Sequence, residues 1–181
     1  MSEITSYMLD TNIFCAIVAG EFHDLPDDGR YFATHIQRDE LGNTKSDADL
    51  RDRLLSLFAE TIEKPISTAG LMAGISVAGG SAPDSGERLV PTEAAIWDTS
   101  TWGESKFDDT SGQIEMLLGR MKEKDGRAKK LSSHAKDVLI LATAIRNGFH
   151  LLTGDVVLFE LAQECGALAT LIQYAAPKQQ P

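Results

Sequence analysis

Short apolar segments alternate with stretches of helical periodicity along most of this chain, and this alternation constrains its fold more than any other feature. Residues 4–9 are largely apolar and end at Asp10-Thr11-Asn12, after which apolar side chains recur at the spacing of a helix. Strands joined through helices pair in parallel with right-handed crossovers. The sequence therefore predicts a three-layer α/β fold, with a parallel sheet flanked by helices.

The same alternation continues to the end of the chain. The interior of one predicted helix, residues 138–142, is apolar nearly all round, which requires neighbours on every side and makes it a central element. Its N-cap is expected at Ser132 or Ser133. The other predicted elements are a strand over 31–36 with a helix through Glu40, helices over 49–62 and 113–124, a strand over 149–153 followed by a helix through Leu158 and Leu161, and a last strand over 168–172.

Residues 70–112 break this pattern, with seven glycines, two prolines and both tryptophans. We predict an insertion there, with a short strand over 88–90 and a short helix over 93–98. Its role stays open between a lid, a partner surface and a pair of strands. With 181 residues, 43% of them hydrophobic, the chain is expected to form a single domain over residues 1–176, followed by a flexible tail at 177–181.

The charge of the chain bears on its partners. A formal net charge of -10 argues against generalised affinity for nucleic acid, which normally needs a basic surface. Basic residues concentrate in residues 120–136, however, where seven of them stand against two acidic ones. Within a loop predicted over 125–130, Arg127, Lys129 and Lys130 are candidate RNA contacts, and a solvated lysine-rich loop is the alternative.

The sequence shows no apolar run long enough to cross a bilayer, and residues 13–19 lack a basic leader, so we expect a cytoplasmic protein without a membrane partner. Cys15 and Cys165 are expected to be reduced, partly buried thiols. The histidines form no spaced pair, so zinc is not indicated; they are His23, His35, His134 and His150.

Four acidic residues stand out by position. Asp10 and Asp155 each follow a predicted strand, while Glu40 and Asp137 lie near the beginnings of helices that pack against the same sheet edge. Clustered carboxylates repel one another and are tolerated mainly beside a divalent cation, for which magnesium or manganese suits carboxylate oxygens best. Taken singly, Asp10 and Asp155 are better explained as helix N-caps, Asp137 as a first-turn acid and Glu40 as a solvated charge.

Residues 8–12, Met-Leu-Asp-Thr-Asn, resemble the opening signature of PIN domains. Glu40-Leu41 resembles the second acid of that family, residues 137–144 its third acid on an alanine-rich helix, and residues 152–155 its last acid. All four occur in the expected order. The resemblance, which covers about 4–44 and 132–172, implies a five-stranded parallel sheet and four residues that serve as catalytic acids and metal ligands: Asp10, Glu40, Asp137 and Asp155.

By this resemblance the chain is a ribonuclease that depends on magnesium or manganese and leaves a 5′-phosphate and a 3′-hydroxyl. Asn12 and Thr153 are then expected to orient the acids or the substrate. Many PIN-like proteins are toxins of toxin–antitoxin pairs, which implies an antitoxin partner and a homodimer. The chain departs from the family at Gly154, where a polar residue is frequent, and Asp39 leaves the register of the second acid open.

Two other functions are compatible with these residues. A phosphatase would use Asp10 as a covalent nucleophile, but such enzymes commonly place an acid two residues later, where this chain has Asn12. A catalytically inert PIN-like scaffold would bind a partner through Trp97 and Trp102, which are equally expected to fill the core.

Overall fold

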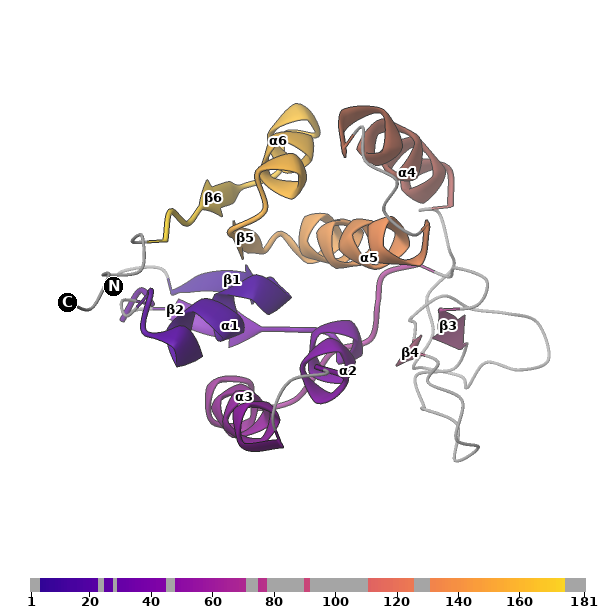
Figure 1. Ribbon diagram of the computed structural model, residues 1–181. Coiled ribbons are helices and arrows are strands. Elements are labelled where there is room, and N and C mark those ends of the chain that lie inside the picture. Colours follow the sequence, from indigo (N-terminus) through magenta and orange to yellow (C-terminus); the bar gives the residue numbers. More distant parts are fainter. Residues whose placement is uncertain are drawn as a thin grey trace.

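The computed structural model describes residues 4–22, 25–27, 29–44, 48–70, 75–77, 90–91, 111–125 and 131–174. Helices and strands alternate through most of this range (Figure 1). In chain order they are β1 (Thr5–Leu9), α1 (Thr11–Ala19), β2 (Gly29–Phe32), α2 (His35–Gly42), α3 (Ala48–Thr61), β3 (Ser76–Val77), β4 (Val90–Pro91), α4 (Ser111–Asp125), α5 (Leu131–Asn147), β5 (His150–Thr153), α6 (Val156–Glu164) and β6 (Ala169–Leu171).

The main sheet has four strands in the order β2-β1-β5-β6, and every pair in it is parallel. The predicted parallel α/β class is confirmed, and the described residues show four of the five strands that the PIN resemblance implied. The chain runs from β1 outward to β2, then returns to place β5 on the other side of β1. The carboxyl ends of β1 and β5 therefore form a topological switch point, the position at which such sheets bind ligands.

Side chains of β1 and β5 alternate between the two faces of the sheet, as the pleat requires. Met8 and Leu151 belong to one hydrophobic cluster with residues of α4, α5 and α6, whereas Leu9 and Leu152 belong to a second cluster with residues of α1 and α3. All four side chains are at most 3% exposed. Figure 1 shows the resulting layers, with α4, α5 and α6 on one face of the sheet and α1 and α3 on the other. The predicted three-layer arrangement is thus present.

Most predicted elements lie close to the observed ones, but three differ. The second strand ends at Phe32, because Thr34 forms a capping box with Gln37 and starts α2 one residue later. Helix α5 begins at Leu131, so Ser132 and Ser133 lie within its first turn and do not precede it as caps. Asp125, predicted in a loop, is the last residue of α4.

The segment predicted as an insertion contributes a small parallel pair, β3 and β4, of which β4 overlaps the strand predicted over 88–90. The helix predicted over 93–98, both tryptophans and the tail at 177–181 lie outside the described residues. The candidate RNA contacts Arg127, Lys129 and Lys130 also lie outside them.

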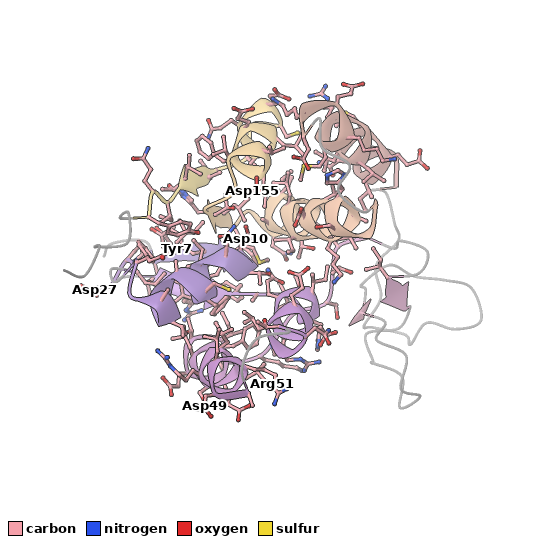
Figure 2. All side chains as sticks on the ribbon, viewed as in Figure 1. Tyr7, Asp10, Asp27, Asp49, Arg51 and Asp155 are labelled. Carbon is pink, nitrogen blue, oxygen red and sulfur yellow. The ribbon has the colours of Figure 1, made fainter. Side chains whose placement is uncertain are left out.

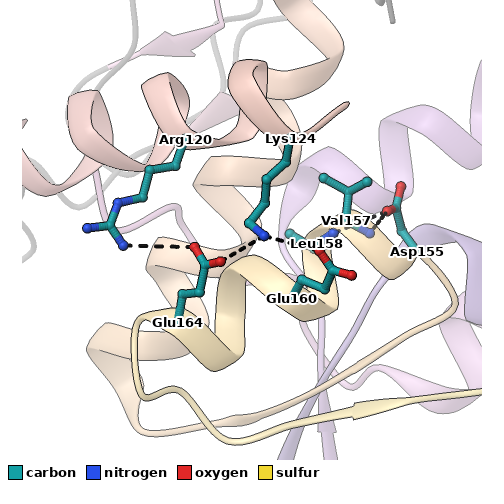
Figure 3. A network of polar contacts seen from close by, with 7 residues as sticks. All are labelled: Arg120, Lys124, Asp155, Val157, Leu158, Glu160 and Glu164. Atoms are coloured by element: carbon teal, nitrogen blue, oxygen red, sulfur yellow. Dashed lines mark hydrogen bonds and ion pairs between the residues drawn. The ribbon is translucent and has the colours of Figure 1, made fainter. Parts of the chain in front are cut away.

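An ion-pair network joins α4 to α6 (Figure 3). The Lys124 ammonium lies 3.1 Å from a carboxylate oxygen of Glu160 and 2.7 Å from one of Glu164, and Arg120 lies 3.9 Å from Glu164. Two basic residues of the 120–136 segment are thus paired within the protein. None of the described helices combines the length and the apolar composition that crossing a membrane would require.

Candidate active site

Asp10 and Asp155 lie where β1 and β5 end (Figure 2). The two strands pair in register from Tyr7 with His150 to Leu9 with Leu152, and the backbone N–H of Asp10 continues this ladder by donating to the Leu152 carbonyl over 3.0 Å. Parallel register thus brings the two acidic motifs to one edge of the sheet. This edge is the switch point between β1 and β5.

The Asp10 carboxylate is 5% exposed and accepts three hydrogen bonds. Its Oδ1 accepts from the Thr11 backbone N–H over 2.7 Å, which makes Asp10 the N-cap of α1. Its Oδ2 accepts from the Asn12 side-chain amide over 2.7 Å and from the Thr153 hydroxyl over 2.6 Å. The capping interpretation is therefore confirmed, but it accounts for only one of the three bonds.

The pKa of Asp10 is raised from 3.8 to about 6. Burial is the largest cause, because it disfavours the charged form, and the negative charges of Glu40 and Asp155 raise the pKa further. The hydrogen bonds from Thr153 and Thr11 act in the opposite direction. A carboxylate in this position is stabilised by any cation that reaches it.

Glu40 approaches this edge from α2. Its Oε2 accepts a 2.6 Å hydrogen bond from the Thr11 hydroxyl, and its Oε1 lies 3.4 Å from the Lys136 ammonium on α5. Buried Gln37 fixes the helix by donating to the Leu9 carbonyl at the end of β1 over 3.0 Å. Glu40 therefore reaches the site, because its partner Thr11 directly follows Asp10 in the chain.

Asn12 and the C-terminal part of the chain complete the wall of the site. The Asn12 Oδ1 accepts from the Gly154 backbone N–H over 2.9 Å and from the Tyr174 hydroxyl over 3.0 Å. Burial, followed by the negative charge of Asp10, raises the pKa of Tyr174 to about 12. Its hydroxyl is therefore protonated at neutral pH and acts as a donor.

The other two predicted acids, Asp155 and Asp137, lie at the start of α6 and on α5. Asp155 is the N-cap of α6, where its Oδ1 accepts from the backbone N–H groups of Val157 and Leu158 over 2.8 and 3.1 Å (Figure 3). Asp137 is half-buried on α5, directly after Lys136. Since Lys136 contacts Glu40, this turn of α5 borders the site.

Carboxylate, amide and hydroxyl oxygens make up the polar lining of this edge, and these are the donors that hard divalent cations prefer. Within the described part of the chain, no group of three or more His, Cys, Asp or Glu side chains is arranged to hold a metal ion. Glu40 is engaged by Thr11 and Lys136, and Asp155 by the start of α6. The carboxylate oxygens of Asp10, Glu40 and Asp155 are donors of the type that magnesium and manganese prefer, and the charges of Glu40 and Asp155 act on Asp10.

The sequence reasoning did not identify three residues of the site. Thr11 lies inside the Asp-Thr-Asn motif, and Lys136 precedes a predicted acid, so both had a local signal. Tyr174 had none, because only the course of the chain after β6 brings it to Asn12. The cysteines are both free, with Cys165 partly buried as predicted and Cys15 exposed, contrary to the prediction.

No protein-family model and no curated protein matches the chain. Similar solved structures include VapBC-5, a member of the VapBC family of toxin-antitoxin systems from Mycobacterium tuberculosis (16% identity, TM-score 0.44, covering 93% of this chain and 98% of that one). Others are VapBC-1 from nontypeable Haemophilus influenzae (17%, 0.42, covering 92% and 98%) and a domain of a functionally unknown protein from Methanocaldococcus jannaschii (15%, 0.43, covering 98% and 97%).

Proposed function

We propose that this chain is a nuclease that hydrolyses RNA phosphodiester bonds with bound magnesium or manganese. The observation that carries the proposal is Asp10, a buried carboxylate at the switch point, whose pKa is raised to about 6 with the charges of Glu40 and Asp155 among the causes. Such an arrangement costs folding free energy in the absence of a cation. A site that binds a divalent cation and a phosphate explains why this cost is retained.

The proposal assigns a role to each acidic residue of the site. Asp10, Glu40 and Asp155 would hold the cation, with Asp137 as a further acid on the neighbouring helix. Bound there, the cation supplies an activated water and neutralises charge on the phosphate. Among the described residues, Thr153 and Asn12 donate to Asp10 Oδ2 and the Thr11 N–H donates to Oδ1, so that a lone pair of Oδ1 would be available to a cation.

Lys136 places a positive charge beside Glu40, at the rim of an otherwise acidic site. Its side chain is 32% exposed, so its ammonium is accessible to a polyanion from solution. This charge supports the assignment of a phosphate-containing substrate, because the net charge of the chain is -10 and local cations must offset it.

The phosphatase alternative receives no support from the geometry. Asn12, at the position where such an enzyme carries a second acid, donates its amide to Asp10 Oδ2 and thereby stabilises the charged carboxylate. The same bond removes a lone pair from a would-be nucleophile.

The test is cleavage of a mixed RNA, and of single-stranded DNA, by purified protein in manganese or magnesium. We expect RNA cleavage that Asp10→Asn lowers by at least about 100-fold, because the substitution removes a metal ligand while keeping the shape of the side chain. Asp52→Asn is the matched control, since this acid is 72% exposed on α3. Equal activity of the parent and Asp10→Asn would show that the cleavage arises elsewhere.

The finer parts of the proposal need separate measurements. End-group analysis of the products is expected to give 5′-phosphate and 3′-hydroxyl termini. The PIN resemblance also leads us to propose a homodimer and an antitoxin partner. Light scattering of the purified chain tests the dimer, and loss of cleavage on co-expression with the protein encoded beside it tests the antitoxin.

A further inference from the structure

Tyr174 reaches the candidate site from the far end of the chain. Beyond β6 the backbone continues alongside β5, since the N–H of Ile172 donates to the Thr153 carbonyl over 2.8 Å. Tyr174 follows two residues later, and its hydroxyl donates to the Asn12 Oδ1 over 3.0 Å. The phenol is half-buried and lies at the edge where β1 and β5 end.

Gly154 provides the space that the phenol occupies. A Cβ atom at this position would lie 2.5 Å from the Tyr174 ring carbon Cε2, and closer still to its hydroxyl oxygen. Any larger side chain would therefore displace the end of Tyr174. Gly154 has no positive φ among the described backbone angles, so it is the close approach of the ring, and not the backbone conformation, that requires glycine.

The hydrogen bond from Tyr174 reinforces the orientation of the Asn12 amide. Its Oδ1 accepts from both Tyr174 and the Gly154 N–H, so its Nδ2 must face Asp10 and donate to Oδ2. The reversed amide would place an acceptor against the carboxylate and an N–H group against the Gly154 N–H, which can only donate. Each of these contacts is unfavourable in a buried site.

We propose that Tyr174 is a positioning residue of the active site, which fixes the Asn12 amide and, through it, the orientation of the Asp10 carboxylate, and that Gly154 is required because it seats the phenol. The role in catalysis rests on the nuclease function proposed above. The positioning itself does not, because it is a property of the protein without substrate.

The first experiment is Tyr174→Phe, which keeps the ring and removes the hydroxyl. We expect kcat for RNA cleavage to fall by about 10-fold with KM nearly unchanged, as for other residues that orient a ligand of a metal. In nuclear magnetic resonance spectra, the side-chain amide signals of Asn12 should shift and exchange faster. Tyr31→Phe is the matched control, because its hydroxyl bonds to the Pro26 carbonyl away from the site.

The second experiment is a double-mutant cycle between Gly154→Ala and Tyr174→Ala. Gly154→Ala should displace the phenol and therefore reproduce the Asn12 signals of Tyr174→Ala. In the Tyr174→Ala background the three atoms nearest this methyl group are gone, so it should have little further effect on thermal stability or on these signals. Effects of the two substitutions that simply add would overturn the proposal.

The two proposals fail in different ways. Unchanged Asn12 signals in Tyr174→Phe overturn the positioning role, whatever the activity of the parent. Shifted Asn12 signals and a non-additive cycle in a parent that cleaves no RNA support the positioning role and overturn the nuclease function. Shifted signals with an undiminished kcat show that the orientation has no part in catalysis and overturn that part of the proposal.

Discussion

The Thr153 hydroxyl donates a 2.6 Å hydrogen bond to Asp10 Oδ2, although the two residues are 143 positions apart in the chain. The oxygen of this hydroxyl also accepts from the backbone N–H of Asp155 over 2.9 Å. One side chain thus ties the acid at the end of β1 to the acid that follows β5. Because both bonds are buried or partly buried, their loss has consequences for charge and for stability.

Thr153→Val should raise the pKa of Asp10 above its present value of about 6, because the hydrogen bond from Thr153 lowers it. The free energy of unfolding at pH 7 should fall by about 1 to 3 kcal/mol, since a buried carboxylate loses a donor. A carbon-detected titration of the Asp10 carboxyl and urea denaturation measure these effects. Thr170→Val, at an exposed position of β6, is the control, and an unchanged Asp10 pKa in Thr153→Val would contradict the prediction.

Glu40→Gln should shift the Asp10 pKa in the opposite direction. The Glu40 charge raises that pKa, so a neutral side chain of the same shape should lower it. The carboxyl titration described for Thr153 measures the shift, with exposed Glu60→Gln on α3 as the control. If Glu40→Gln leaves the titration where it was, the two acids do not interact.

Asp10→Asn should stabilise the fold at pH 8. A carboxyl whose pKa is raised from 3.8 to about 6 does not lower the free energy of unfolding below pH 3.8, where it is protonated in both states. It lowers that free energy progressively as the pH rises from 3.8 through 6. The full cost is about 3 kcal/mol, and Asn remains a good N-cap, but its Nδ2 would face the donor amide of Asn12, so we expect a gain of about 1 kcal/mol at pH 8 and none at pH 4. Denaturation at both pH values tests this, and Asp52→Asn should show no such difference.

Manganese should raise the melting temperature of the parent more than that of Asp10→Asn. A ligand at 100 times its Kd adds about 2.7 kcal/mol to the stability of the state that binds it, and the substitution removes the central carboxylate of the site. Thermal melts with and without metal, followed by addition of a chelator, measure the effect. Equal shifts in the two proteins would place the ion elsewhere.

His134→Ala should destabilise the packing of α4 on α5. The His134 Nε2 lies 2.8 Å from the Asp125 carboxylate, and both side chains are only 4% exposed. Loss of this contact should lower the free energy of unfolding by about 1 to 3 kcal/mol. His150→Ala, which removes a more exposed histidine bonded to Thr170, should cost less in the same denaturation experiment. The reverse order would mean that the buried pair contributes little.

The alternating strands and helices, and with them the parallel α/β class of the fold, could be predicted from the sequence alone. The apolar segments before Asp10 and through Thr153 predicted two buried strands, and helices between the strands required parallel pairing. The same reasoning placed Asp10 and Asp155 at one sheet edge, because parallel strands end on the same side. These inferences succeeded because they depend on periodicity and on backbone geometry, both of which are local properties.

Only the tertiary structure decided how the side chains of the site are engaged. The register of β5 against β1 brings Thr153 to Asp10, the bond from Gln37 to the Leu9 carbonyl holds α2 where Glu40 meets Thr11, and the path beyond β6 brings Tyr174 to Asn12. In the sequence Gly154 is a departure from the family motif, whereas in the structure glycine is required there because the Tyr174 ring lies against it. Such pairings depend on contacts between residues far apart in the chain, which no local pattern encodes.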